Sequence, residues 1–92
     1  MKEYVKQLQE NKTVSFRPRG SSMKGKIEDG QLVTVSPDVS NLNKDDIVLC
    51  KVKGNHYLHL IKAIKGDQYL IGNNRGGING WTNKKNIFGK VI

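Results

Sequence analysis

Hydrophobic residues in this 92-residue chain come in short runs, most of them with a period of two, and polar turns separate the runs. A period of two is typical of β-strands. The pattern predicts strands over residues 13–17, 31–36, 46–53, 56–64, 69–71 and 87–92. Near the N-terminus, Tyr4, Val5 and Leu8 recur at three- and four-residue spacing, which predicts a short helix over residues 2–11. So narrow an apolar stripe cannot hold a helix by itself, so this helix must pack on the core or on a partner.

The predicted fold class is mainly β, a small coiled or barrel-like sheet with one short helix. The length allows a single domain, with residues 1–12 as the helical segment and residues 13–92 as the β core. Ten glycines and two prolines fit a chain with many turns. The strand over 46–53 is predicted to be half-buried, with Val48, Cys50 and Val52 on its apolar side. As the only cysteine, Cys50 forms no intramolecular disulfide, and we interpret it as a packed small hydrophobe.

Composition and charge limit the cellular locations and the binding partners that we expect. No apolar run reaches the ~20 residues that cross a bilayer, and the first twelve residues lack the apolar segment of a signal peptide. We therefore expect no membrane association and a cytoplasmic location. The formal charge is +8, from 16 Lys and Arg against 8 Asp and Glu. This excess favours polyanions, but the basic residues are scattered, so nucleic acid is a secondary expectation.

The most informative stretch runs from Ser15 to Val35 and is predicted to be strand, tight loop and strand. Within it, the pattern F-x-x-x-G-x-S-M starts at Phe16, and an Asp-Gly pair and an apolar strand follow. This order resembles the nucleophile segment of the LexA-like and signal-peptidase-like serine proteases. The resemblance extends over about residues 14–92, through KDDIV at 44–48, GNN at 72–74 and FGKV at 88–91. It implies the LexA C-terminal fold, the catalytic core of signal peptidases, and it implies that Ser22, rather than Ser21, is the nucleophile.

The same resemblance places the general base on the strand over 56–64. Aligning the hairpin turn at Gly54 puts His59 at the base position, which is similar to the histidine branch of the superfamily, the SipW-like and endoplasmic-reticulum signal peptidases. Side-chain parity gives an independent check, because His59 shares a face with Tyr57 while His56 and Lys62 point the other way. Imidazole also needs less change in its pKa than a lysine does to accept a proton near neutral pH.

Two features of the last third of the chain depart from these relatives. Asn73 stands where signal peptidases have the aspartate of a Gly-Asp-Asn box, and no Asp or Glu follows Asp67. Asn74 is then the nearest candidate to orient the base, and a dyad without a carboxylate is expected to be slow. We expect Trp81 and Phe88 to cover the core, with a place for Trp81 beside a substrate pocket as the alternative. The Gly- and Asn-rich residues before Trp81 have too little apolar surface to order themselves.

The leading functional hypothesis is a serine endopeptidase with a Ser22–His59 dyad. Backbone N–H groups of Ser22 and Met23 would stabilise the oxyanion. Gly20, Ser21 and Tyr57 are candidates for the groove that takes an extended protein or peptide substrate. The 21 residues before Ser22 contain neither Ala-Gly nor Cys-Gly, so we expect cleavage in trans.

The alternative hypothesis is a catalytically weak or inactive LexA-like domain that binds nucleic acid or an acidic protein through its basic surface. A metal site built from His56 and His59 is disfavoured by their opposite parity and by the lack of nearby Cys or carboxylate ligands. We expect no metal and no cofactor. A homodimer formed through sheet edges stays open, because relatives often dimerise in this way.

Overall fold

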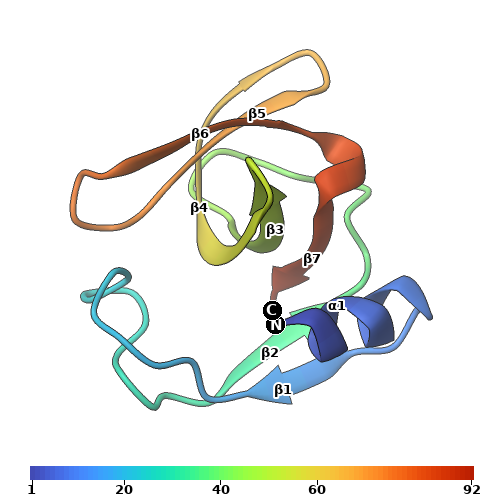
Figure 1. Ribbon diagram of the computed structural model, residues 1–92, viewed down its shortest axis with the longest axis vertical. Helices are drawn as coiled ribbons and strands as arrows, with labels where there is room; N and C mark the ends of the chain where they lie inside the picture. The colour runs from blue at the N-terminus through green and yellow to red at the C-terminus, as the bar shows by residue number, and fades with distance from the viewer.

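Seven antiparallel strands form one coiled sheet in the computed structural model, which describes residues 1–92 (Figure 1). The strand order is β1-β2-β7-β3-β4-β5-β6. The last strand of the chain, β7, therefore lies inside the sheet, between β2 and β3. The mainly β architecture with one short helix is as predicted. In chain order the elements are α1 (Lys2–Gln9), β1 (Val14–Phe16), β2 (Val33–Ser36), β3 (Ile47–Val52), β4 (Asn55–Lys65), β5 (Gln68–Gly72), β6 (Ile78–Asn83), the 3-10 turn η1 (Lys84–Asn86) and β7 (Ile87–Val91).

Strand β3 lies at the centre of the sheet, between β4 and β7, and it separates two hydrophobic clusters. Leu49 packs with α1, β1 and β2, whereas Val48 and Cys50 pack with β5 and β7. All three side chains have no exposed surface. The prediction of a half-buried strand therefore holds at Lys51, which is exposed, and is wrong at Leu49, because α1, β1 and β2 cover that residue on the second face.

Helix α1 packs on the first of these clusters. Val5 and Leu8 are buried, and the ring of Tyr4 stacks on that of Phe16 with 4.3 Å between centroids. The helix thus gains from packing the stability that its eight residues cannot supply alone. It ends two residues earlier than the pattern predicted. No helix in the structure combines the length and apolar character that crossing a membrane requires.

The segment before Trp81 differs from the prediction, because residues 78–83 form strand β6. Hydrogen bonding to β5 orders this strand, even though its sequence, INGWTN, has little apolar surface. Trp81 points outward and is 47% exposed, so it does not cover the core, and Thr82 takes the buried position instead. Phe88 is half-buried and packs against the first cluster, as expected. The hairpin of β5 and β6 then projects over the same end of the sheet as the loop between β1 and β2 (Figure 1).

Candidate active site

Ser22 lies on the loop between β1 and β2, which we call the Ser22 loop (residues 17–30). Two hydrogen bonds close its neck, from Gly30 N–H to the Pro18 carbonyl (2.9 Å) and from Gly20 N–H to Asp29 Oδ1 (2.8 Å). Gly20 has φ +107°, a value that a residue with a Cβ rarely adopts. The Asp-Gly pair of the sequence motif therefore serves to shape the loop.

The interior of the Ser22 loop is anchored by apolar side chains. Met23 and Ile27 are each 5% exposed and belong to the first hydrophobic cluster. The N–H of Ile27 bonds to the Met23 carbonyl at 2.8 Å and closes a tight turn directly after Ser22. The serine is thus presented at the start of a turn whose next residue is fixed in the core.

Strand β4 carries the histidine. A two-residue turn, Lys53–Gly54, joins β3 to β4, and both residues have positive φ, as a tight hairpin requires. This turn lies one residue earlier than the sequence indicated. Up to His59, β4 pairs only with β3; Leu60 pairs with both β3 and β5, and the residues after it that pair do so with β5. His59 is 8% exposed, and its ring stacks with that of Tyr57 at 5.0 Å, so these two residues share a face, as parity predicted.

The structure brings Ser22 and His59 together although 37 residues separate them in the chain. Ser22 Oγ lies 3.1 Å from His59 Nε2, and His59 Nδ1 lies 2.7 Å from Asn79 Oδ1 on β6. An amide oxygen can only accept, so Nδ1 carries the ring proton. Nε2 is then left with its lone pair toward the serine, and the Ser22 hydroxyl donates to it. This hydroxyl–imidazole–amide chain has the arrangement that activates a serine nucleophile.

Asn79, rather than Asn74, contacts the histidine. The Asn74 amide instead donates from Nδ2 to the Lys24 carbonyl at 2.8 Å, in the Ser22 loop. The assignment of Asn74 as the residue that orients the base was therefore wrong. Finding Asn79 from the sequence would have required strand β6, which pairs with β5 and brings residue 79 beside β4, and the hydrophobic pattern does not predict that strand.

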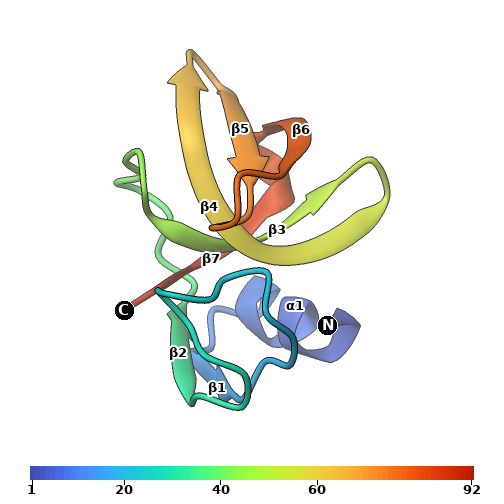
Figure 2. The same cartoon turned by 90° about the vertical axis from the view of Figure 1, so that its left-hand side faces the viewer.

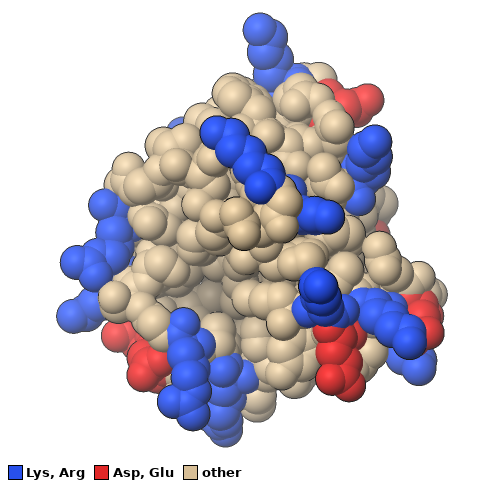
Figure 3. All heavy atoms as spheres, viewed as in Figure 1, with Lys and Arg blue, Asp and Glu red and all other residues tan.

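A pocket of about 150 Å3 opens beside the two side chains, between the Ser22 loop and the first half of β4. Figure 3 shows a hollow in this face with mostly uncharged walls. Gly20 and Tyr57 line the pocket, as expected, whereas Ser21 does not. The Ser21 hydroxyl accepts a hydrogen bond from Arg75 Nη1 at 3.0 Å. The apolar part of the lining comes from both walls and from the N-terminus: Met1, Pro18, Met23, Ile27 and Leu58.

Comparison with known families agrees with this geometry. The family model described as Peptidase S24-like matches residues 2–92. The chain belongs to this family. Comparisons with curated proteins and with solved structures gave no significant match. The resemblance to LexA-like and signal-peptidase-like proteins is thus confirmed for the superfamily, and it indicates a hydrolase of the serine-peptidase type.

Burial adjusts the proton affinity of the titratable groups of this S24-like protein. Burial lowers the pKa of His59, and the hydrogen bond to Asn79 opposes that change in part. The imidazole is therefore neutral at neutral pH and able to accept a proton. The pKa of His56 is also lowered, by burial first and then by Lys51 and other nearby positive charges. Burial raises the pKa of the Cys50 thiol to about 12, so this thiol is not a nucleophile.

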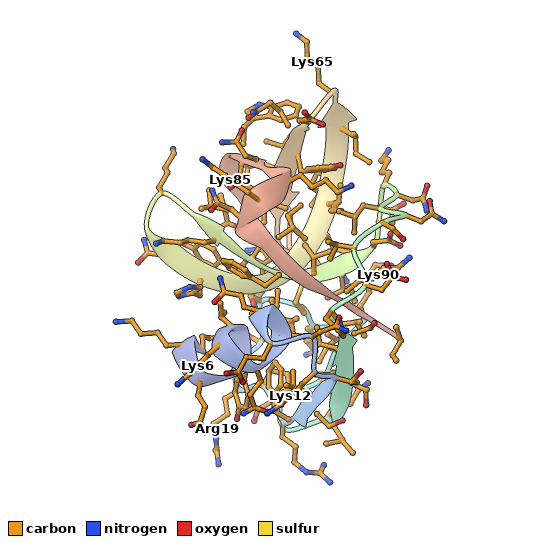
Figure 4. All side chains as sticks on the ribbon, turned by 90° about the vertical axis from the view of Figure 1, so that its right-hand side faces the viewer. Lys6, Lys12, Arg19, Lys65, Lys85 and Lys90 are labelled. Atoms are coloured by element: carbon orange, nitrogen blue, oxygen red, sulfur yellow. The ribbon has the colours of Figure 1, made fainter.

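The basic residues of the S24-like chain are spread over its surface. Figure 4 shows Lys65 and Arg19 at opposite ends of the molecule, with Lys85 and Lys90 between them. Ion pairs join Lys12 to Glu10 at 3.6 Å and Lys90 to Asp46 at 3.3 Å. No group of three or more His, Cys, Asp or Glu side chains is arranged to hold a metal ion. The hollow beside Ser22 is the place where the candidate catalytic side chains Ser22 and His59 meet.

Proposed function

We propose that this S24-like protein is a serine endopeptidase in which Ser22 is the nucleophile and His59 the general base. The observation that carries the proposal is the contact of 3.1 Å between Ser22 Oγ and His59 Nε2, with Asn79 on the other ring nitrogen. The distance falls within hydrogen-bond reach, which a general base requires. The lowered pKa of His59 keeps its acceptor form populated near neutral pH.

In the acylation step, Ser22 Oγ bonds to the carbonyl carbon of the substrate and its proton passes to His59 Nε2. The tetrahedral intermediate then collapses, and the carbon–nitrogen bond breaks. The leaving amine takes the proton from His59, so the ring returns to its neutral form. Asn79 Oδ1 accepts from Nδ1 throughout and stabilises the transient imidazolium.

Deacylation repeats this chemistry with water. His59 Nε2 takes a proton from a water molecule that attacks the acyl carbon, and it then returns the proton to Ser22 Oγ as the ester bond breaks. The products are a free carboxylate and a regenerated serine. Asn79 supplies no negative charge, so we expect the imidazolium to be less stabilised than beside a carboxylate and the rate to be modest.

The backbone around the serine supplies donors for the oxyanion. The N–H groups of Ser22 and Met23 make no hydrogen bond to the backbone, and both lie next to the nucleophile. Such unpaired donors would stabilise the charge that develops on the carbonyl oxygen. Stabilisation of this kind is worth roughly 100- to 1000-fold in rate for one donor in other serine peptidases.

The substrate is expected to bind as an extended strand beside the first half of β4. Residues 55–59 pair with β3 on one side only, and the Ser22 loop faces their other side across the pocket. A peptide here would gain backbone hydrogen bonds and place one side chain in the apolar pocket. A volume of about 150 Å3 suits a small or medium apolar side chain. We propose that this peptide comes from another chain.

His59, rather than Lys62, is the base in this proposal. Lys62 lies beyond the point where β4 begins to pair with β5, and its Cε is 3.0 Å from the place of a Cβ at Gly72. Its side chain thus lies against Gly72, and it makes no hydrogen bond to Ser22, whose hydroxyl contacts His59 instead. The use of a histidine supports placement in the histidine branch of the superfamily.

The test is labelling with a fluorophosphonate probe, together with cleavage of a peptide library. We expect the wild type to be labelled at Ser22 and the Ser22→Ala variant to be unlabelled. The matched control is Ser21→Ala, which removes the neighbouring hydroxyl and should keep most of the labelling. His59→Gln should label far more slowly than the wild type. Labelling that persists in Ser22→Ala would refute Ser22 as the nucleophile, and a wild type that is not labelled would leave the binding-module alternative.

A further inference from the structure

The loop between β5 and β6, residues 73–77, contacts three residues of the Ser22 loop: Ser21, Ser22 and Lys24. Asn74 N–H donates to the Ser22 carbonyl at 2.9 Å, and Asn74 Nδ2 donates to the Lys24 carbonyl at 2.8 Å. Arg75 Nη1 donates to the Ser21 hydroxyl at 3.0 Å. All three bonds hold the backbone or side chains that immediately flank the nucleophile. Figure 2 shows the Ser22 loop just below the end of the β5–β6 hairpin.

The loop that makes these contacts is itself fixed. Asn73 Oδ1 accepts from the N–H groups of Arg75 and Gly77, each at 2.8 Å, and Asn73 N–H donates to the Gly77 carbonyl at 2.9 Å. A side chain that bonds to its own backbone two and four residues on gives a rigid turn. Asn74 is therefore presented by a folded support.

The Ser22 loop leaves little room beside the Asn74 side chain. A Cβ at Gly25 would lie 3.1 Å from Asn74 Nδ2, and Gly25 has φ +97°. Glycine is thus needed at this position for the amide to approach the loop. The rest of the Ser22 loop is secured at its neck and through the buried Met23 and Ile27. Neither restraint acts on the Ser22 carbonyl, which Asn74 N–H holds.

We propose that Asn74 is a positioning residue that holds Ser22 at its distance from His59 by bonding to the Ser22 loop. The inference rests on the proposed function, because positioning matters to the rate only if Ser22 attacks a substrate. Asn79 follows five residues later and holds the ring of His59. One short segment, residues 73–79, thereby fixes both catalytic side chains relative to each other.

The inference predicts different effects on the labelling rate and on its pH dependence for the loss of Asn74 and for the loss of Asn79. Loss of the Asn74 side-chain amide removes the hydrogen bond to the Lys24 carbonyl, which holds the turn after Ser22 against residues 73–77. The nucleophile is then held less firmly, whereas the contact of His59 with Asn79 stays intact. A displacement of the order of 1 Å costs roughly 100-fold in rate, so a partial loss of restraint should cost roughly 10- to 100-fold. The pH dependence of the rate, which reports the titration of His59, should not move.

The experiment measures the rate constant of fluorophosphonate labelling against pH for Asn74→Ala and Asn74→Asp. Neither variant can donate from the side chain, and the second keeps the size of asparagine. Both should label roughly 10- to 100-fold more slowly than the wild type. The control is Asn41→Ala, an exposed asparagine outside the site, which should label at the wild-type rate. In Asn74→Ala, which adds no charge, the acid limb of the profile should coincide with that of the wild type.

Amide hydrogen exchange tests the role of Asn74 independently of the proposed peptidase activity. The N–H groups of Lys24 and Lys26 close the turn after Ser22, and they should exchange faster in both Asn74 variants than in the wild type. Wild-type exchange at these amides, or wild-type labelling rates, would overturn the inference. A shift of the acid limb in Asn74→Ala would also overturn it, since the residue would then act through His59. If Ser22 of the wild type is not labelled, the proposed function fails, while exchange still decides whether Asn74 holds the loop.

Discussion

The hydrogen bond between His59 and Asn79 offers the sharpest quantitative prediction. Replacement of Asn79 by Leu keeps nearly the same volume and removes the oxygen that lies 2.7 Å from His59 Nδ1. In the transition state the imidazole becomes positively charged, and a hydrogen bond to a charged group is worth about 1.5–3 kcal/mol. Its loss should lower the rate of labelling at Ser22 by about 10- to 150-fold.

Asn79→Asp is the informative counterpart. A carboxylate beside Nδ1 favours the protonated ring, so it raises the pKa of His59 above its value next to the amide. The base is then protonated over a wider acidic range, and the acid limb of the labelling profile moves to higher pH. Above that limb the rate should exceed that of the wild type, because the charge of the carboxylate stabilises the imidazolium. Asn79→Leu removes the contact that opposes the effect of burial, so its acid limb should move to lower pH.

The assay is the pseudo-first-order rate of fluorophosphonate labelling between about pH 5 and pH 9, the range over which an imidazole base titrates. Asn83→Leu is a matched control, since Asn83 lies on the same strand and its amide contacts Gln68 outside the site. It should label as the wild type does. Equal rates and superimposed profiles for Asn79→Leu and the wild type would refute the role of Asn79.

Two further predictions follow from burial. The unfolded chain binds more protons than the folded one below about pH 6.5, because the pKa values of His56 and His59 are both lowered. The free energy of unfolding should therefore fall as pH drops through this range, and urea titrations of His59→Gln should show a smaller fall; an unchanged pH dependence would contradict this. The Cys50 thiol, whose pKa burial raises to about 12, should resist iodoacetamide in the native protein and react once urea unfolds it. Rapid alkylation of the native protein would show that Cys50 is accessible.

The sequence pattern predicted those parts of the site where local periodicity holds. In the first half of β4 the pairing with β3 is regular from the hairpin turn to His59, so parity correctly placed Tyr57 and His59 on one face. The order of residues in the Ser22 loop singled out Ser22, and the structure places it beside His59. The pattern failed at Leu49 in β3, because the burial of this residue depends on α1 and β1, which lie far away in the sequence. The residue pattern of a single strand does not show whether distant elements cover its second face.

Strand β6 shows why alternation would have misplaced its residues even had the strand been recognised. Asn79 reaches His59 and Thr82 is buried, while Ile78 and Trp81 are exposed. The two inward residues are three positions apart, which strict alternation forbids. Gly80 lies between them with φ +134°, and the register shifts where β6 meets Gly72, so the strand changes parity there. Alternation counted from a buried Trp81 would have turned Asn79 inward but Thr82 outward, and alternation counted from Thr82 would have turned Asn79 outward. The same local break therefore accounts both for the exposed tryptophan and for the amide that holds the histidine.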